Sequence, residues 1–167
     1  DVTVSRGLGD VYKRQKLSEC SGHLGIAGGQ YLDLSYERKK ISRNKILEME
    51  IKKTGMLFSF CCAAPAIIKK KTIQEIKFFE NIGSKIGLLF QIADDLIDLK
   101  SNSKEAGKKT GKDQKKGKAT LINLIGYDDS LKYCDKIIKD INKNLRKYGS
   151  RSEKINETLG YILNRKK

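Results

Sequence analysis

The chain has 167 residues, enough for one domain with a modest core, and its net charge of +15 is compatible with binding a nucleic acid, a membrane surface or an anionic small substrate. Its four cysteines have no Cys-x-x-Cys spacing and it has a single histidine, which argues against a zinc site and a disulfide framework. No apolar run reaches the roughly 18 residues that span a bilayer, and no signal peptide is visible, so we expect a reduced, cytoplasmic protein with no transmembrane segment.

The first fifteen residues, DVTVSRGLGDVYKRQ, differ from everything that follows. They show no sustained helical period. The string VSRGLGDVYKRQ resembles translated sequencing-adapter sequence, so we expect residues 1–15 to be a non-native or disordered N-terminal segment. An ordinary flexible N-terminus is the alternative. We therefore place the folded domain at residues 16–167.

Helical patterns begin after this segment. Residues 16–25 are predicted to end a helix, and the small residues of 25–34 would let two helices, or a helix and a ligand, approach closely. Ser42 is a suitable N-cap for a further helix over 43–67. Apolar residues in that helix follow i, i+3, i+4 and i+7 spacing, which predicts one buried face. They are Ile46, Met49, Met56, Phe60 and Ala63.

The longest pattern runs over 73–99 and is apolar nearly all round, which predicts a helix at the centre of the domain. Gly83 and Gly87 would each weaken an isolated helix by about 1 kcal/mol relative to alanine, so their presence indicates close packing. Residues 100–117 are lysine-rich and are predicted to form a loop. Because strand alternation is absent, we expect an all-α fold. The remaining helices are predicted over 118–125, 128–147 and 152–164.

Three carboxylates lie late in the central helix, in the run FQIADDLID at 90–98. On an α-helix Asp94 and Asp98 lie about 40° apart on one face and roughly 6 Å apart along the axis, with Asp95 beside them. These charges repel one another, and their apolar neighbours make them costly to desolvate. Mg²⁺ relieves both costs, because it takes oxygen ligands and completes its shell with water and substrate phosphates. A solvated acidic patch is the alternative, and the apolar flanks argue against it.

Lysines supply positive charge at two other places. Gly107-Lys108 and Gly117-Lys118 lie on the loop that follows the carboxylates, and lysine is a compact point charge suited to phosphate. Gly117-Lys118 at the start of a helix would also offer N-terminal amides to an anion. Lys53-Thr54-Gly55 lies inside the predicted helix 43–67, among apolar residues. For Lys108 and Lys118 the alternative is an ordinary solvated lysine-rich loop. For Lys53 the alternative is a lysine whose aliphatic stem covers an apolar face.

The motifs occur in a fixed order: GGQxxDL, KTG, FQxxDDxxD and GKxxGxDxxxGKxT. This order resembles the C-terminal half of the trans-polyprenyl diphosphate synthases, the family of farnesyl, geranyl and geranylgeranyl diphosphate synthases. The resemblance covers residues 16–167 and implies the isoprenoid synthase helical bundle with its N-terminal half missing. It also implies a prenyltransferase of isoprenoid biosynthesis, a homodimer in its full-length form. Such an enzyme condenses isopentenyl diphosphate with an allylic diphosphate through Mg²⁺-assisted ionisation.

The resemblance assigns roles to the residues that match its motifs. The ligands of Mg²⁺ are Asp94, Asp95 and Asp98. The lysines that bind the allylic diphosphate are Lys53, Lys108 and Lys118. The catalytic residues that it implies are Lys53, Thr54 and Gln91. Of these, Thr54 and Gln91 match residues near the reacting carbons, where a carbonyl or hydroxyl dipole stabilises cationic charge. The positions that line the substrate cavity are Gln30 and Asp33.

The sequence departs from the family pattern in one respect. The first aspartate-rich motif and the upstream basic residues that bind isopentenyl diphosphate are absent, and the only other paired aspartates, Asp128-Asp129, lack a third carboxylate. We therefore expect this chain to be part of a longer enzyme and inactive alone. A non-catalytic partner subunit of a heteromeric prenyl synthase is the first alternative. A basic nucleic-acid-binding protein is the second, but no recognition-motif spacing supports it, so we expect no nucleic-acid partner.

Overall fold

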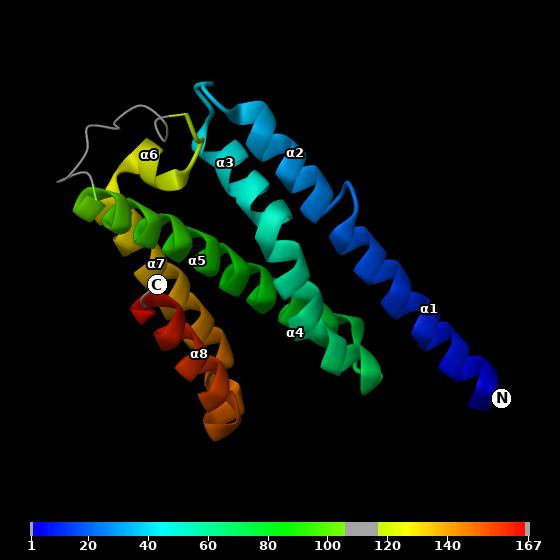
Figure 1. Cartoon of the computed structure of the whole chain (residues 1–167). Coiled ribbons are helices and arrows are strands. Elements are labelled where there is room, and N and C mark those ends of the chain that lie inside the picture. Colours follow the sequence, from blue (N-terminus) through cyan, green and yellow to red (C-terminus); the bar gives the residue numbers. More distant parts are fainter. Residues whose placement is uncertain (1, 106–116, 166–167) are drawn as a thin grey trace. The chain divides into compact units, whose positions relative to one another are not determined.

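A computed structural model describes the backbone of residues 2–105 and 117–165, and the side chains of residues 10–100 and 117–165. Every regular element in these ranges is helical, as predicted (Figure 1). In chain order the elements are α1 (Val2–Ser21), α2 (Ile26–Tyr36), α3 (Arg43–Glu50), the π-helical turn η1 (Ile51–Gly55), α4 (Met56–Ile68), α5 (Ile73–Glu105), α6 (Leu121–Ile125), α7 (Tyr127–Leu145), the 3-10 segment η2 (Arg146–Ser152) and α8 (Glu153–Asn164).

The chain divides into two compact units, of which the first comprises the described residues of Asp1–Leu32 and Glu48–Leu88. In it α1 packs along α4. Small and branched side chains of α4, together with Ile76 of α5, form a buried cluster that Tyr12 and Phe79 cover. The α4 members of that cluster are Ala63, Ala66 and Ile67.

That residues 1–15 are a non-native or disordered segment stays a prediction. The backbone is helical from Val2, and Tyr12 packs against this cluster. One turn later the ammonium of Lys16 lies 3.3 Å from the Glu80 carboxylate. Burial acts to lower the pKa of Lys16, but the hydrogen bond and charge of Glu80 outweigh it, so that pKa is raised. Tyr12, Lys16 and the buried Cys20 share one face of α1 at four-residue spacing. None of these three is aliphatic, which explains why the apolar pattern did not reveal the helix.

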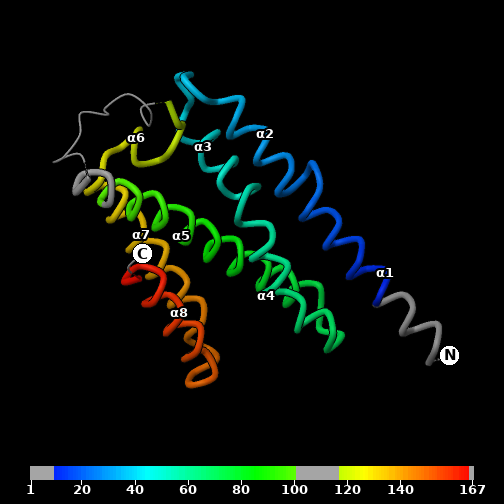
Figure 2. The backbone as a smooth tube through the Cα atoms, viewed as in Figure 1, coloured from blue at the N-terminus to red at the C-terminus, as the bar shows by residue number. Residues whose placement is uncertain are grey.

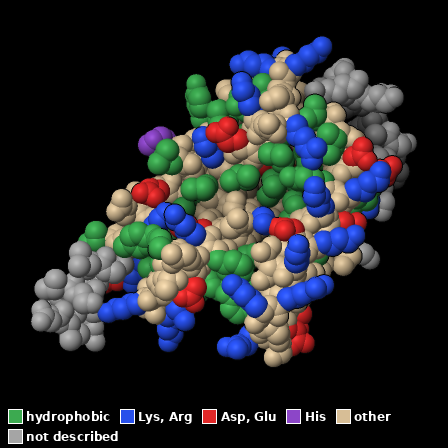
Figure 3. Space-filling view, turned by 180° about the vertical axis from the view of Figure 1, so that it is seen from behind, with side chains coloured by type: hydrophobic (Ala, Val, Ile, Leu, Met, Phe, Trp, Pro, Cys, Tyr) green, Lys and Arg blue, Asp and Glu red, His purple; other side chains and the backbone are tan. Residues whose placement is uncertain are grey.

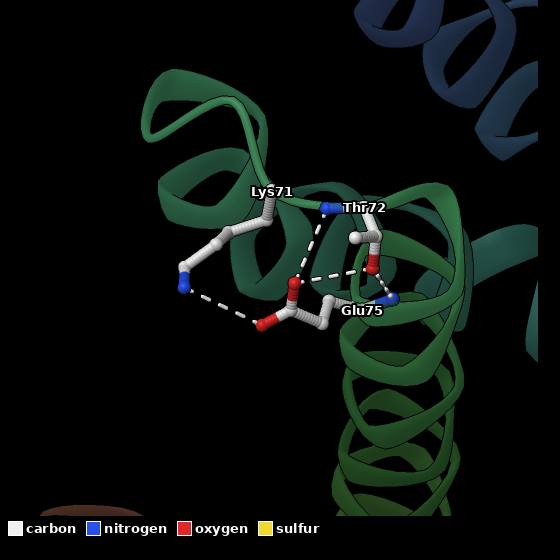
Figure 4. A network of polar contacts seen from close by, with 3 residues as sticks. All are labelled: Lys71, Thr72 and Glu75. Atoms are coloured by element: carbon white, nitrogen blue, oxygen red, sulfur yellow. Dashed lines mark hydrogen bonds and ion pairs between the residues drawn. The ribbon is translucent and has the colours of Figure 1, made fainter.

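A capping box defines the start of α5 (Figure 4). The Glu75 amide donates to the Thr72 hydroxyl at 3.2 Å, and the Thr72 amide donates back to the Glu75 carboxylate at 3.2 Å. This reciprocal pair satisfies two amides that the first helical turn leaves without an intrahelical partner. Lys71 adds an ion pair to the same carboxylate, with Nζ and Oε1 3.5 Å apart.

The second unit comprises Asp33–Leu47 and the described residues of Leu89–Lys167. Here α6 packs against α7, and η2 packs against both α7 and α8. Gly126 ends α6 with a φ of 86°, a conformation that residues with a Cβ rarely adopt. The core of this unit consists of aliphatic side chains that are almost fully buried, namely Leu89, Ile92, Leu121, Ile141, Leu145 and Leu159.

Most predicted helices are confirmed, and the following differences concern their number, regularity and length. The segment 26–36 is a helix, α2, although its glycines gave no clear helical pattern. The predicted helix 43–67 is present but contains the π turn, and Figure 2 traces α3, η1 and α4 as one continuous course. The helix predicted over 73–99 continues to Glu105, because neither glycine nor proline occurs between Leu99 and Gly107.

One stretch, Arg43–Ile68, has 26 residues and is long and apolar enough to cross a membrane, judged by length and composition alone. We had expected no stretch of this kind. Core helices of soluble proteins pass the same test, so the stretch is weak support for a membrane span. The absence of a transmembrane segment therefore stays a prediction.

Candidate functional site

The three aspartates of the DDxxD run lie on the second half of α5, in the second unit. Leu89 and Ile92 on the same stretch of helix are fully buried and hold it against the core. The Asp94 side chain, by contrast, is 52% exposed. Asp95 and Asp98 are half-buried. The helix is thus buried along one face and presents carboxylates from another, and Asp94 is more exposed than the apolar flanks of the motif predicted.

Neighbouring polar groups contact Asp94 and Asp95. Gln91 Nε2 donates to Asp95 Oδ1 at 3.4 Å, one helical turn away. Arg165, the residue after α8, donates from Nη2 to Asp94 Oδ1 at 2.5 Å. Gln91 was a predicted site residue, whereas Arg165 was not. No local pattern indicates Arg165, because it lies 71 residues from Asp94 along the chain.

The donor set fits Mg²⁺ as a site shared with a ligand. Within the described residues no group of three or more His, Cys, Asp or Glu side chains converges on a point where a metal could bind. Mg²⁺ is usually held by only one or two carboxylates together with water and phosphate oxygens. Asp94 and Asp98, adjacent on one face of α5, provide that smaller set. Chemically, this turn can therefore hold a hard cation that bridges to a phosphate.

Lys53 and Thr54 lie in the π turn η1, in the first unit. The amide of Met56 donates to the carbonyl of Ile51, an i→i+5 bond that replaces the α-helical i→i+4 pattern. Single π turns inside α-helices are frequent at functional sites. Both side chains are half-buried. The KTG motif thus lies at a local irregularity of the helix, whereas apolar periodicity predicted a regular helix over 43–67.

Glycines on two other helices allow backbone to contact this turn directly. A Cβ on Gly29 of α2 would lie 2.2 Å from the Lys53 amide nitrogen, and one on Gly87 of α5 would lie 2.6 Å from the Gly55 Cα. Neither approach is possible for a residue with a side chain. The predicted close packing at 25–34 and at Gly87 is therefore confirmed, and both contacts are made to the same five-residue turn.

The other residues assigned from the GGQxxDL motif lie on α2. Gln30 directly follows Gly29 and is exposed, while Asp33 lies three residues further and is half-buried. Gln30 belongs to the first unit with Lys53 and Thr54, whereas Asp33 belongs to the second. Cavity lining stays a prediction for both.

The Lys118 side chain is exposed, but hydrogen bonds to the carbonyls of Gly117 and Lys118 hold the backbone on either side of it. The Gly117 carbonyl accepts from the Arg38 amide at 2.8 Å. The Lys118 carbonyl accepts from Asn123 Nδ2 at 2.7 Å. The predicted helix 118–125 begins only at Leu121, and the Thr120 hydroxyl accepts from the Asn123 amide. Our prediction that helix N-terminal amides face an anion at Gly117-Lys118 is therefore wrong. Lys108 lies outside the described residues.

The chain is similar to known proteins in family profile, in sequence and in structure. A family profile described as polyprenyl synthetase matches residues 15–162. The heterodimeric geranylgeranyl pyrophosphate synthase large subunit 2 of Arabidopsis thaliana is 32% identical over 163 residues, covering 94% of this chain and 43% of that protein. The farnesyl diphosphate synthase of Micrococcus luteus is 29% identical over 151 residues, covering 90% of this chain and 52% of that protein.

Solved structures agree with these sequence matches. An FPP/GFPP synthase from Zymomonas mobilis superposes with a TM-score of 0.76 at 29% identity, over 92% of this chain and 51% of that one. A geranyltransferase from Helicobacter pylori, complexed with magnesium and isoprenyl diphosphate, superposes with a TM-score of 0.72 at 26% identity, over 92% of this chain and 50% of that one. The chain thus spans about half the length of these relatives.

Proposed function

Because the chain belongs to the polyprenyl synthetase family, we propose that it carries half of the catalytic site of a Mg²⁺-dependent prenyltransferase. The reaction would join isopentenyl diphosphate to an allylic diphosphate. The observation that supports this most strongly is the DDxxD turn of α5, whose opposite face is buried while Asp94 is accessible. The solved relative that holds magnesium and isoprenyl diphosphate supports the same ligand chemistry.

Asp94, Asp95 and Asp98 would hold Mg²⁺, which when bound would withdraw charge from the departing diphosphate. Gln91 keeps Asp95 oriented through its hydrogen bond, which limits the positions that this carboxylate can take. In this proposal Gln91 also offers its carbonyl dipole to the cationic charge that develops on the allylic carbon.

Lys53, Lys108 and Lys118 would bind the diphosphate oxygens as point charges. The Lys118 backbone is fixed by its neighbours, so the loss of freedom on binding is confined to its side chain. Thr54 lies next to Lys53 in the π turn, where a dipole can face the reacting carbons. Gln30 and Asp33 would line the cavity that excludes water from the cation.

The test compares binding of a non-hydrolysable allylic thiodiphosphate with and without Mg²⁺, by titration calorimetry. Asp94→Asn and Asp98→Asn should each weaken Mg²⁺-dependent binding about tenfold or more, because each removes an anionic ligand of the cation. The matched control is Asp128→Asn, an exposed aspartate of the second Asp-Asp pair, which should bind as the original chain does. Equal losses in all three variants, or binding that ignores Mg²⁺, would contradict the proposal.

Two other functions remain as outcomes of further tests. A relative that is one subunit of a heterodimeric synthase keeps the partner-subunit function open, and Mg²⁺-independent association with a complete synthase would favour it. Lys and Arg side chains are spread over the whole face displayed in Figure 3, with acidic groups between them. Among the described residues on that face, the distribution does not form the basic stripe expected of a nucleic-acid interface.

A further inference from the structure

Arg165 is held in place by three groups of the site-bearing helix. Its guanidinium carbon lies 3.9 Å from the centroid of the Phe90 ring. Nη2 donates to the Phe90 carbonyl at 3.4 Å and to Asp94 Oδ1 at 2.5 Å. The Arg165 side chain is only 15% exposed. A planar guanidinium suits this combination of an aromatic face and a carboxylate, and a lysine ammonium does not.

A cation on Asp94 would bind the same carboxylate group that accepts from Arg165, through either of its two oxygens. A divalent cation on Asp94 Oδ1 would also lie within a few ångströms of the guanidinium, where the two positive charges repel strongly. Arg165 and the cation therefore compete for Asp94.

The Arg165 Nε atom adds an independent observation. It is buried and has no hydrogen-bond partner among the described residues. A buried donor without a partner carries a desolvation cost, which moving the side chain into water would relieve. Arg165 also follows the last residue of α8 with extended backbone angles, φ −62° and ψ 138°, so its movement does not require the helix to unwind.

We propose that Arg165 is a positioning residue that holds Asp94 in the metal-free chain and is displaced when a divalent cation binds. Cation binding would thereby release the Arg165 side chain from α5. This inference rests on the proposed function, because it requires Asp94 to be a metal ligand. The inference adds that Arg165, a residue of the same chain, competes with the cation for the Asp94 carboxylate.

The first test measures Mn²⁺ binding to the purified chain by the electron paramagnetic resonance signal of free Mn²⁺. Arg165→Gln should bind Mn²⁺ about three- to tenfold more tightly, the range expected for removing a partly buried charge-assisted bond. Arg165→Lys keeps the positive charge but lacks the planar guanidinium. Its Mn²⁺ affinity should therefore lie between those of the original chain and Arg165→Gln. The control Lys154→Gln removes the same charge from an exposed position on α8 and should change affinity little.

The second test follows the Arg165 Nε–H signal by nuclear magnetic resonance during a Mg²⁺ titration. The signal should shift with the same midpoint as metal binding, and its hydrogen exchange should accelerate as the side chain becomes solvated. A purely structural arginine would show neither change. This readout uses the unmodified chain, so it does not depend on the folding of any variant.

Different results would contradict the role of Arg165 and the proposed metal site. If Arg165→Gln binds Mn²⁺ no more tightly than the original chain, the inference about Arg165 is wrong and the proposed metal site still stands. The same holds if the Nε–H signal stays unchanged while the metal binds. If neither the original chain nor any variant binds Mn²⁺, the proposed metal site is wrong and the inference falls with it.

Discussion

Gly29 lies directly against the backbone of Lys53, so that a Cβ on Gly29 would stand 2.2 Å from the Lys53 amide nitrogen and 2.5 Å from its Cα. The contact joins α2 to the π turn without any intervening side chain. Backbone atoms cannot rotate away as the end of a side chain can. The position of Lys53, which we propose to bind diphosphate, therefore depends on the absence of a side chain at residue 29.

Gly29→Ala should destabilise the chain by about 2 kcal/mol, because overpacking against backbone costs more than the roughly 1 kcal/mol that alanine adds to helix propensity. Gly160→Ala is the matched control, since a Cβ there would have nothing within 4 Å. It should stabilise α8 by up to about 1 kcal/mol. Urea unfolding followed by circular dichroism measures both. If Gly29→Ala proves as stabilising as Gly160→Ala, the close approach of α2 to the π turn is wrong.

The capping box of α5 predicts a loss of stability in acid. Hydrogen bonds from the Thr72 amide and hydroxyl lower the pKa of Glu75. A lowered carboxyl pKa stabilises the fold above the ordinary value of about 4.3, and this stabilisation is lost as the pH falls through the lowered pKa. Replacing Glu75 by glutamine should remove this part of the pH dependence. Thr72→Ala should cost about 1 kcal/mol at neutral pH through loss of the N-cap.

Lys71→Gln separates the cap from the neighbouring ion pair. It removes the contact with Glu75 and leaves the reciprocal bonds with Thr72 intact. Because exposed ion pairs contribute little, this variant should unfold within about 0.5 kcal/mol of the original chain. A loss as large as that of Thr72→Ala would mean that the ion pair, and not the cap, holds the start of α5.

The cysteines predict an order of alkylation. Cys61 is exposed, Cys62 is half-buried, and Cys20 and Cys134 are buried. Burial also raises the pKa of the Cys20 and Cys62 thiols, which lowers the fraction of reactive thiolate. Brief treatment of the folded chain with iodoacetamide, followed by peptide mass spectrometry, should find Cys61 modified first. Early labelling of Cys134 would show that α7 does not pack as described.

The missing first aspartate-rich motif predicts that this chain alone does not turn over substrate. Half of the carboxylates expected in the site are absent from the sequence, so ionisation of an allylic diphosphate would lack much of its charge stabilisation. Incubation of the purified chain with Mg²⁺, radiolabelled isopentenyl diphosphate and geranyl diphosphate should give no product above the protein-free control. Mg²⁺-dependent prenyl transfer would contradict this expectation.

Periodicity predicted much of the fold correctly, because burial on a helix follows a simple repeat. The stripe on α5 is an example: its predicted members are Ile82, Ile86, Leu89, Ala93, Leu96 and Ile97, of which the first five are buried and Ile97 is half-buried. The same reasoning predicted that the DDxxD aspartates lie on a core helix. Periodicity therefore identified the buried helix, whereas the assignment of its aspartates as metal ligands rests on the family motif and stays a prediction.

Long-range contacts account for what the sequence did not predict. The π turn at Lys53 coincides with backbone contacts from Gly29 and Gly87, which are distant in the chain. Arg165 reaches Asp94 from beyond α8, and nothing in its local sequence indicates a partner. Tyr12 joins α1 to α4 and α5 through a single aromatic ring in a polar segment. Each of these features depends on tertiary packing and not on local periodicity.

The central claim is that Asp94 and Asp98 hold a divalent cation that bridges to a diphosphate. The most direct measurement is a crystal structure of the chain grown with Mn²⁺ and an allylic thiodiphosphate, with data collected at the manganese absorption edge. We predict an anomalous peak between the Asp94 and Asp98 carboxylates and the diphosphate, with Arg165 moved away from Asp94. A bound diphosphate with no manganese at these carboxylates would contradict the account.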